Sequence, residues 1–523
     1  MPNNGTFKII LKQVGHLQIV LGFVFCVPML VSLFFGEYYS ASGFLISSII
    51  TLTLGYVLYK GFKNTPEPLL RHALIIAALG WLMIAVMGSL PFLIIAYITP
   101  AEIAQQIVPV GETYISSLIY FKNPLHCLFE SMSAYTTTGL TMAIHEPSIG
   151  KGLLFYRSFA QWVGGAGFIV LALAVFQQVG GKSVMFLFSS ETSSERLKPT
   201  IIDTARSIWK MYLGLTLFST IYLIIGTLII LPDYNIVENI FNSVNHAMTG
   251  QSTGGFSTLD DSIAGYKSMA MDNLYLLPMI LGSLAIPFYV KVIIGKQFSL
   301  IWKDSETKAI LILCFFGSII MSLFLMSSGN ISEPFRIGVF QFISSLTTTG
   351  WQTSDVNIWN SPSIAFILLP MIIGGASGAT VGGIKIYRFI TILKGVNWNL
   401  NRYFMSANSV HVVELNRKRI LPDEMNKELA SVATFSFMYL VIVFMSALIT
   451  YFFSGHNYSL AASFFESASA SGTVGLSAGI TNPEMSPLIE ITYMFQMWLG
   501  RLEIIPILVL FRTILFGTKP FLT

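Results

Sequence analysis

Apolar residues are distributed along this chain in long runs separated by short polar segments. Each run is long enough for about 20 residues of helix, which at about 1.5 Å per residue crosses the hydrocarbon core of a bilayer. The pattern predicts an all-α polytopic membrane protein with about ten transmembrane helices. The runs lie near residues 15–36, 41–60, 72–98, 153–180, 208–231, 273–295, 308–327, 363–392, 429–453 and 487–514.

Composition and charge agree with this pattern. The chain has 523 residues, of which 54% are hydrophobic and 11% charged, and its mean hydropathy is +0.69. A soluble protein needs a more polar surface, so the membrane is the expected solvent. Basic residues are concentrated in alternate segments between the runs, and the positive-inside rule then predicts a multi-pass plasma membrane protein with both termini cytoplasmic. The opposite segments hold only Lys122, Lys151, Lys267 and Arg336.

The apolar runs after the second one form an internal repeat. They group in pairs, and the outward connection of each pair carries a shorter apolar segment followed by one rich in threonine and glycine. This pattern predicts four helix, pore-loop and helix units around one central pore, preceded by an extra N-terminal helix pair. The expected boundaries are 1–65 for the helix pair, 66–185, 186–300, 301–395 and 429–523 for the four units, and 396–428 for a cytoplasmic linker.

Three of the connecting loops align without a gap. Their sequences are FESMSAYTTTGL from Phe129, FQFISSLTTTGW from Phe340 and FESASASGTVGL from Phe465. The loop of the second unit, VNHAMTGQSTGGFS from Val244, has a divergent first half but a similar ending. We align the Ser-Thr-Gly of that ending, residues 252–254, with the last Thr-Thr-Gly or Thr-Val-Gly of the other three.

The repeated ending of these loops predicts an ion-selectivity filter. A cation that sheds its water must be met by backbone carbonyls, and glycine readily adopts the positive φ that turns such carbonyls inward. An ordinary polar turn explains any single loop equally well, but not four copies at matched positions. The residues expected in the filter are Thr137, Thr138, Gly139, Ser252, Thr253, Gly254, Thr348, Thr349, Gly350, Thr473, Val474 and Gly475.

A glycine-rich segment interrupts the eighth apolar run and predicts a gate. Each glycine costs a helix roughly 1 kcal/mol relative to alanine, so we expect a break at mid-membrane. Irregular backbone at that depth must be buried in protein or line water, and below a filter it would obstruct the path. A glycine-rich helix-packing face is the alternative, whereas the GxxxxGKS/T spacing of a phosphate-binding loop is absent. The glycines are Gly374, Gly375, Gly378, Gly382 and Gly383.

One arginine, Arg501, lies within the last apolar run, between MWLG and LEIIPILVL. An ionised arginine there costs about 2.5–3.5 kcal/mol on insertion scales unless it faces water or a partner. We therefore expect it to face the pore or the gate. The alternative is a pair with nearby Glu503, or a side chain that extends to the cytoplasmic interface.

The motifs together resemble a known family. The four loops, the early helix pair, GGASGATVGGIK from Gly374 and LGRLEI from Leu499 are similar to the Trk-type potassium uptake subunit, called TrkH in bacteria. The resemblance covers essentially the whole chain. The related KtrB type leaves residues 15–60 unexplained, and some sodium-passing plant HKT relatives replace the first-loop glycine, which is present here as Gly139.

This resemblance implies potassium uptake across a bacterial inner membrane or an archaeal cell membrane, with potassium ion as the transported substrate held in the filter. It implies an intramembrane gate at the glycine-rich segment, a homodimer in membrane lipid, and control by a cytoplasmic TrkA-like nucleotide-binding regulatory subunit. The segment 394–427, with its NRKR run at 416–419, is the largest expected docking surface, or else an anchor for the positive-inside orientation.

Other functions are weighed against this one. A secondary transporter would move a solute by alternating access around broken helices, and a less selective Na⁺/K⁺ pathway exists in the same superfamily. A non-transporting scaffold leaves four filter-like loops without purpose. The sequence carries no Ser-His-Asp or paired-carboxylate constellation, no GxGxxG in a βαβ unit and no basic stripe, so we expect no enzyme, no organic cofactor and no nucleic-acid partner.

Acidic residues are predicted on the outer side of the membrane. Carboxylates there would concentrate cations near the pore, or would simply be solvated. They are Glu146, Asp260, Asp261, Asp355 and Glu484.

The filter assignment predicts the effect of Gly350→Ser. A side chain in the left-handed region costs about 1–2 kcal/mol, so the serine should displace the carbonyls and lower the selectivity for K⁺ over Na⁺. Reversal potentials of the purified variant in liposomes measure this change. An unchanged reversal potential in a normally expressed variant would contradict the assignment.

Overall fold

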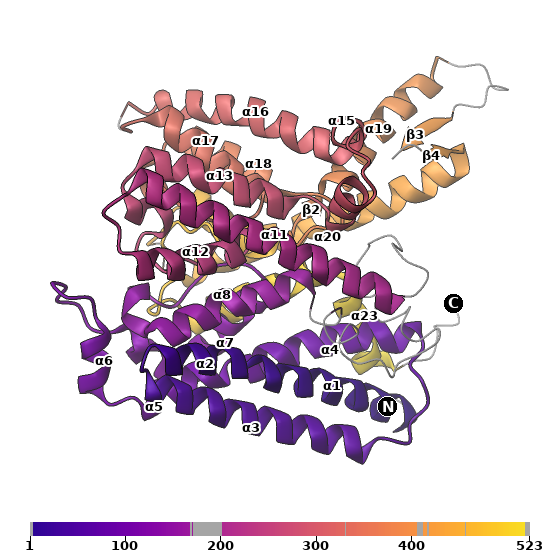
Figure 1. Cartoon of the computed structure of the whole chain (residues 1–523). Helices are drawn as coiled ribbons and strands as arrows, with labels where there is room; N and C mark the ends of the chain where they lie inside the picture. Colours follow the sequence, from indigo (N-terminus) through magenta and orange to yellow (C-terminus); the bar gives the residue numbers. More distant parts are fainter. Residues whose placement is uncertain are drawn as a thin grey trace.

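The computed structural model describes residues 4–167, 170, 201–329, 331–404, 412–415, 418–455 and 457–517. Within these ranges the chain is a bundle of helices, most of which run in nearly the same direction, with two short strand pairs (Figure 1). The predicted fold class, an all-α polytopic membrane protein, is confirmed. The later part of the run expected at 153–180 lies outside the described residues.

The N-terminal helix pair is a hairpin at the edge of the molecule. α1 (Asn4–Val24) continues into α2 (Cys26–Phe34), and α3 (Tyr38–Gly61) returns beside them. Gly15 and Gly55 lie where α1 crosses α3, and a Cβ atom on either glycine would lie 2.8 Å from the other's carbonyl oxygen. The two glycines therefore allow the helix backbones to touch.

The carboxylate of Glu37, in the turn between α2 and α3, connects this pair to the first pore unit. It accepts hydrogen bonds from the backbone N–H groups of Lys151 (2.6 Å) and Gly152 (2.9 Å), which begin α8 (Lys151–Ala166). A carboxylate at a helix N-terminus also meets the positive end of the helix dipole. The helix pair thus fixes the start of a helix that continues to the centre of the molecule.

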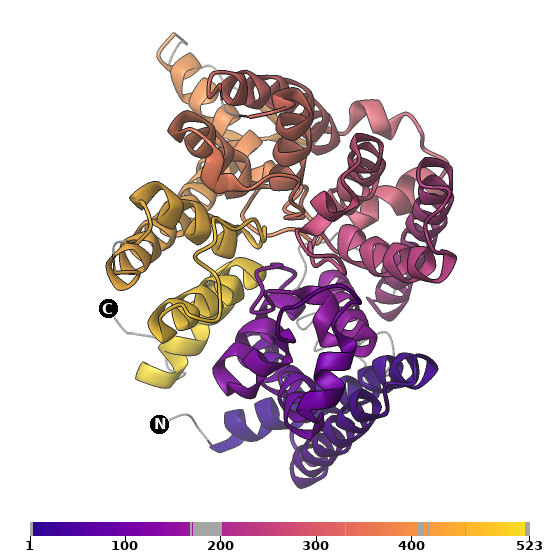
Figure 2. The ribbon, with the colours of Figure 1, turned by 90° about the vertical axis from the view of Figure 1, so that its left-hand side faces the viewer.

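Viewed along the helices, successive parts of the chain surround one central axis, and the N-terminal pair lies outside the first of them (Figure 2). The first part comprises α4 (Leu70–Gly88), α5 (Leu90–Ile98), α6 (Ala101–Ile107), η1 (Ser117–Lys122), α7 (Pro124–Tyr135), η2 (Glu146–Ile149) and α8. The second comprises α11 (Ile201–Ile230), α12 (Ile236–Gln251), η3 (Ser262–Tyr266), α13 (Met269–Ser283), α14 (Ile286–Tyr289) and η4 (Val290–Ile294).

The second half of the chain completes the circle. The third part comprises α15 (Leu300–Lys303), α16 (Ser305–Met326), α17 (Pro334–Leu346), η5 (Val356–Ile358), α18 (Ser361–Ile372), β1 (Ile373–Gly374), β2 (Ile384–Lys385) and α19 (Ile386–Arg402). An antiparallel pair, β3 (Val413–Leu415) with β4 (Lys418–Ile420), follows. The fourth part comprises α20 (Pro422–Phe453), α21 (Leu460–Gly472), α22 (Pro487–Leu502) and α23 (Ile505–Phe516).

Within the described residues, six helices are long and apolar enough to cross a membrane, or seven if one bent pair counts as one span. The bent pair, α13 with the helix that follows it, turns by 94°, so the uninterrupted helix expected at 273–295 is wrong. The backbone groups freed at this bend bond to the glycine-rich segment. Ala376 N–H donates to Ser283 O (3.0 Å), and Ile286 N–H donates to Gly378 O (3.3 Å).

The helix expected at 487–514 is also interrupted, between α22 and α23. Glu503 and Ile504 both have positive φ, 58° and 68°. Ile504 N–H donates to Leu499 O (3.2 Å), and the Glu503 carboxylate pairs with Arg388. A local hydrogen bond and the ion pair with Arg388 therefore hold the break, and Pro506 at the start of α23 prevents α22 from continuing. The break predicted after α18 is present, and it begins at Ile373.

Candidate functional site

Loops with one shared backbone geometry follow the pore helices α7, α12, α17 and α21. In the first loop, Thr138 N–H donates to the carbonyl oxygen of Ser133 (2.9 Å). The preceding residue, Thr137, is left-handed (φ 59°), and so is the following one, Gly139 (φ 94°). The donors equivalent to Thr138 are Gly254, Thr349 and Val474, at 2.8, 3.0 and 2.9 Å from their acceptors. The left-handed pairs are Thr253 and Gly255, Thr348 and Gly350, and Thr473 and Gly475.

This geometry corrects the alignment of the second loop by one residue. The left-handed glycine there is Gly255 (φ 75°), whereas Gly254 occupies the place of Thr138. The expected triplet 252–254 is therefore wrong as an equivalent of 137–139, and the equivalent triplet is 253–255. Ser252 instead corresponds to Thr136, the residue at the C-terminus of its pore helix. Two adjacent glycines hid the register, because only backbone handedness distinguishes them.

The left-handed glycines bring neighbouring loops into contact. A Cβ atom at Gly139 would clash with the carbonyl oxygen of Gly254, and one at Gly255 would clash with that of Thr349. In the same way, Gly350 abuts the carbonyl oxygen of Val474, and Gly475 abuts that of Thr138. Each glycine thus touches the same atom of the next loop, and the fourth loop returns to the first. The predicted filter segments of the four units thus meet in one closed ring, with Gly255 instead of Gly254 as the left-handed glycine of the second loop.

On each pore helix, one polar side chain bonds to the part of the loop that follows the left-handed glycine. Sequence reasoning missed these residues. They stand eight positions before Thr138, Gly254, Thr349 and Val474. The Glu130 carboxylate accepts from Met142 N–H (2.8 Å), and Glu466 accepts from Ala478 N–H (2.8 Å). Their equivalents are His246, which accepts from Thr258 N–H at 3.3 Å, and Gln341, which donates to the Thr353 hydroxyl at 3.4 Å.

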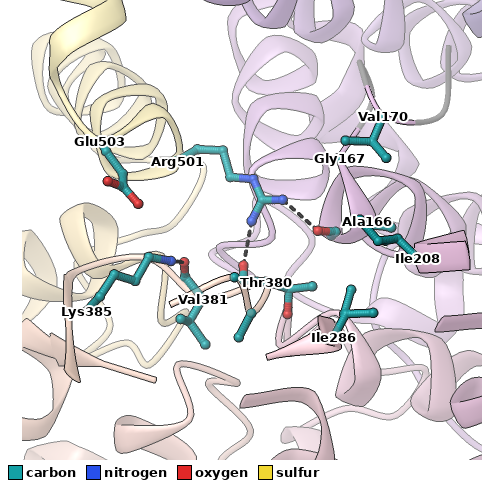
Figure 3. A pocket seen from close by; sticks show the side chains of 13 residues that line it. Ala166, Gly167, Val170, Ile208, Ile286, Thr380, Val381, Lys385, Arg501 and Glu503 are labelled. Atoms are coloured by element: carbon teal, nitrogen blue, oxygen red, sulfur yellow. Dashed lines mark hydrogen bonds between the residues drawn. The ribbon is translucent and has the colours of Figure 1, made fainter. Parts of the chain in front are cut away.

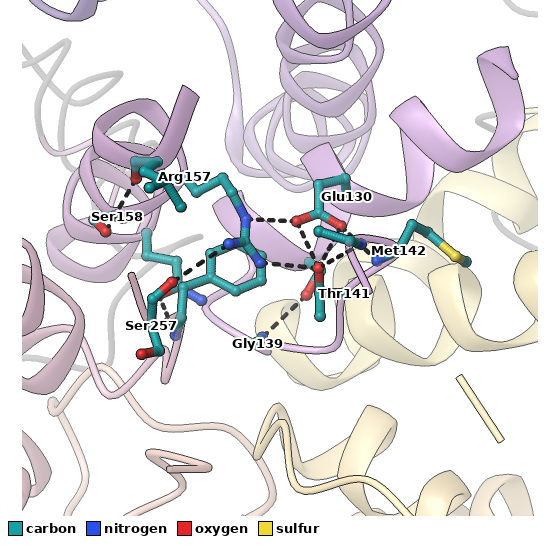
Figure 4. A network of polar contacts seen from close by, with 12 residues as sticks. Glu130, Gly139, Thr141, Met142, Arg157, Ser158 and Ser257 are labelled. Carbon is teal, nitrogen blue, oxygen red and sulfur yellow. Dashed lines mark hydrogen bonds and ion pairs between the residues drawn. The ribbon is translucent and has the colours of Figure 1, made fainter. Parts of the chain in front are cut away.

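The first of these supports is an ion pair, shown in Figure 4. Arg157, which is 1% exposed, donates from Nε to the fully buried Glu130 carboxylate (2.7 Å) and from Nη2 to the Thr141 hydroxyl (2.9 Å). Its Nη1 reaches the carbonyl oxygen of Ser257 in the second loop (3.4 Å). Through these bonds the ion pair connects the first loop to the second. Removing one partner of such a buried pair would leave an uncompensated charge.

On one side of the ring lies a vestibule of about 700 Å³. The glycines 139, 255, 350 and 475 line its floor, together with the carboxylate-bearing residues Glu146, Asp261 and Asp355. Its described lining contains no lysine or arginine. Asp260 and Glu484 are not among the lining residues, and Asp260 lies 3.6 Å from His145. Burial raises the pKa of Glu146 to about 8, so the negative charge that the vestibule presents toward the ring comes from Asp261 and Asp355.

On the other side of the ring lies the glycine-rich segment, a loop between β1 and β2. These strands pair in parallel and hold the ends of the loop together, with Ile373 opposite Ile384. Gly374 lies beside the carbonyl oxygen of Gly382, where a Cβ atom would clash. Gly378 and Gly383 have positive φ (81° and 72°).

Thr380, near the middle of this loop, touches the ring of pore loops. Its hydroxyl lies 3.0 Å from the hydroxyl of Thr253, and its carbonyl oxygen accepts from the Thr137 hydroxyl (3.4 Å). Gly382 faces the hydroxyl of Thr473, where a Cβ atom would clash. The loop thus lies directly against three of the left-handed threonines. Sequence reasoning found the loop from its glycines but not the threonine that makes the contact.

Arg501 extends from α22 to this loop (Figure 3). Its guanidinium donates to the carbonyl oxygens of Thr380 (2.5 Å), Gly164 (2.5 Å) and Gly165 (2.8 Å). It also borders a cavity of about 60 Å³ with Lys385 and Glu503. Glu503 forms an ion pair with Arg388, and the guanidinium of Arg501 joins the loop between β1 and β2 to the first unit.

The fold and the site define a pore-loop membrane transport protein with pseudo-fourfold symmetry. Residues 72–519 match the model of the TrkH family, described as cation transport proteins. An uncharacterized cation transporter of Methanocaldococcus jannaschii is 31% identical over 97% of this chain and 96% of its own length. The chain therefore belongs to the TrkH family of cation transport proteins.

Further relatives have named activities. The Trk system potassium uptake protein TrkH of Escherichia coli is 26% identical over 97% of this chain and 98% of its own length. TrkI of Halomonas elongata, which carries the same description, is 29% identical over 96% and 95%. The crystal structure of the potassium transporter TrkH from Vibrio parahaemolyticus has a TM-score of 0.76 and 24% identity, and covers 96% of this chain and 98% of its own. That likeness confirms the fold.

The position of Arg501 predicts the effect of Arg501→Gln. A positive charge beside the path raises the energy of a passing cation by about 1 kcal/mol at a separation of several ångströms, and its loss should raise K⁺ conductance roughly fivefold. Glutamine keeps a hydrogen-bonding amide while it removes the charge. Liposome flux measures the change, with Arg402→Gln, in the last turn of α19, as a charge-removal control that should give no increase. Unchanged conductance with lowered thermal stability would assign Arg501 a structural role.

Proposed function

We propose that this chain conducts potassium ions across the plasma membrane through the ring formed by the pore loops, for net potassium uptake. The observation that carries the proposal is the closed sequence of glycine-to-carbonyl contacts. Each left-handed glycine abuts a carbonyl oxygen of the next loop, and that oxygen belongs to the residue just before the next left-handed glycine. Rings of backbone carbonyls replace the water shell of K⁺ in pores of this kind. The printed names of the relatives in Escherichia coli and Halomonas elongata support potassium as the ion.

Electrostatics around the ring favour a cation. The C-terminal ends of the pore helices lead directly into the filter loops, so the negative ends of their dipoles lie beside the ring. The vestibule adds the carboxylates of Asp261 and Asp355, which raise the local concentration of cations. The path therefore attracts cations before the filter selects among them.

The loop between β1 and β2 is the proposed gate. Thr380 and Gly382 lie against the ring, and the loop closes the path on the side opposite the vestibule. Arg501 holds the closed position through the carbonyl of Thr380 and adds a positive charge beneath the filter. Conduction then requires Thr380 to leave its contacts with Thr137 and Thr253.

The membrane orientation follows from the charges between the spans. The vestibule faces outward, and both termini, the β3–β4 hairpin and the gate face the cytoplasm. In this orientation a TrkA-like nucleotide-binding regulatory subunit reaches the gate from the cytoplasm, and two copies of the chain associate in the lipid bilayer. The description "Trk system" of several relatives supports a multi-component assembly.

Reversal potentials of the purified chain in liposomes test the function directly. With K⁺ on one side and Na⁺ on the other, we expect a reversal potential close to the K⁺ equilibrium potential. A potential near zero would indicate the less selective Na⁺/K⁺ pathway. Solute transport by alternating access, with no ion current, would overturn the proposal altogether.

The gate proposal predicts that deleting residues 376–379 raises K⁺ flux. The shortened loop cannot bring Thr380 to the ring, so one obstruction is removed from the path. Flux of ⁸⁶Rb⁺ into liposomes measures the effect. Ser377→Ala is the matched control, because Ser377 bonds to Glu306 through its backbone N–H and the loop keeps its length. Equal or lower flux in a folded deletion variant would make the loop a structural element.

A further inference from the structure

The second loop has glycine at a position where its own backbone does not require it. Gly254 stands where the other loops have Thr138, Thr349 and Val474. Its φ lies outside the left-handed region, in contrast to that of Gly255. The backbone conformation at position 254 therefore allows a residue with a side chain. The reason for a glycine here must be a neighbouring group that occupies the space of the side chain.

That neighbour is the side chain of Gln161, on α8 of the first unit. The three heavy atoms nearest to a Cβ atom built at Gly254 all belong to Gln161, and all lie under 3.0 Å from it. Gln161 is fully buried. The space that a threonine side chain would need in the second loop is thus already occupied, by a residue more than ninety positions earlier in the chain.

Gln161 also satisfies the backbone of the filter on both sides of Gly255. Its Nε2 donates to the carbonyl oxygen of Gly254 (2.5 Å), and its Oε1 accepts from Phe256 N–H (3.1 Å). A glutamine amide is suited to this pair of partners because it combines one donor and one acceptor. The carbonyl of Gly254 is the one that Gly139 abuts, so Gln161 acts at the junction between the first and second loops.

The first and third loops use their own hydroxyl groups at this place, whereas the fourth loop carries the valine side chain of Val474. The Thr138 hydroxyl lies 2.8 Å from that of Thr136, and the Thr349 hydroxyl lies 2.9 Å from that of Thr347. In the second loop Ser252 corresponds to Thr136, but Gly254 offers it no hydroxyl. Two consecutive glycines give this segment more conformational freedom than its counterparts, so an outside support is needed.

We propose that Gln161 replaces the missing side chain of filter residue 254 and is a positioning residue for ion selectivity. The inference rests on the proposed function, since it assumes that the ring selects K⁺. In this proposal, the loop of the second unit is supported by a side chain of the first unit. Loss of Gln161 should therefore loosen the carbonyl of Gly254 while leaving the fold intact.

The first test is Gln161→Met, which keeps the length and volume of the side chain but removes both hydrogen bonds. Reversal potentials under K⁺ and Na⁺ gradients should show the K⁺/Na⁺ permeability ratio reduced about fivefold, because the carbonyl oxygen of Gly254 loses its one hydrogen bond from Gln161 and one net hydrogen bond is equivalent to about that factor. Size-exclusion profile and thermal stability should stay close to those of the unmodified chain. A variant with unchanged selectivity overturns the inference, whereas an unmodified chain without K⁺ selectivity overturns the proposed function as well.

The second test exchanges the two positions. Gly254→Thr alone should clash with Gln161 and lose selectivity or folding. Combining it with Gln161→Ala should restore K⁺ selectivity, because the new side chain fits the vacated space and its hydroxyl can pair with Ser252, as in the first and third loops. A double variant no better than Gly254→Thr alone, or a single variant equal to the unmodified chain, overturns the inference.

The matched control is Gly255→Thr with Gln161→Ala. Gly255 has φ 75°, and a Cβ atom there would clash with the carbonyl oxygen of Thr349, so removing Gln161 frees no space for it. This pair should stay unselective. Rescue at position 255 equal to that at position 254 would show that Gln161→Ala acts non-specifically and would also overturn the inference.

Discussion

The contact between a glycine of one pore loop and a carbonyl oxygen of the next is the constraint on which the rest of the structure depends. At Gly139, Gly255, Gly350 and Gly475 the backbone is left-handed and the space for a Cβ atom is filled by the neighbouring loop. These contacts allow separate units to form one ring. The helices around the ring place the four loops close enough for the contacts to form, and the polar supports hold them in that position.

The inner helices serve the same constraint through their own glycines. Gly164 of α8 packs on the carbonyl oxygen of Tyr135, at the end of the first pore helix, and Gly282 of α13 packs on that of Gly250. In α22, Gly500 packs on the carbonyl oxygen of Ser471. The bend after α13 and the break between α22 and α23 lie just beyond these contacts.

Sequence patterns predicted the parts of this arrangement that repeat. Long apolar runs indicated the spans, three loops aligned without a gap, and glycine density located the break after α18. The alignment of the second loop was predicted one residue too early, because the sequence does not show which of the adjacent glycines, Gly254 or Gly255, adopts the left-handed conformation. The supports escaped because only Glu130 and Glu466 are the same residue, whereas His246 and Gln341 stand at that position in the other two units. The break at Glu503 was missed although Pro506 inside the expected helix is a local signal for it, because a proline cannot donate the backbone hydrogen bond that would continue α22.

The central claim is that the ring of glycine contacts creates a cation site on the axis of the molecule. Anomalous X-ray diffraction from crystals grown in Rb⁺ or Tl⁺ tests this most directly, because both ions substitute for K⁺ and scatter strongly. We predict an anomalous peak on the axis, level with the carbonyl oxygens of Thr138, Gly254, Thr349 and Val474. Ordered pore loops with no peak at that level, and anomalous density only elsewhere in the protein, would contradict the account.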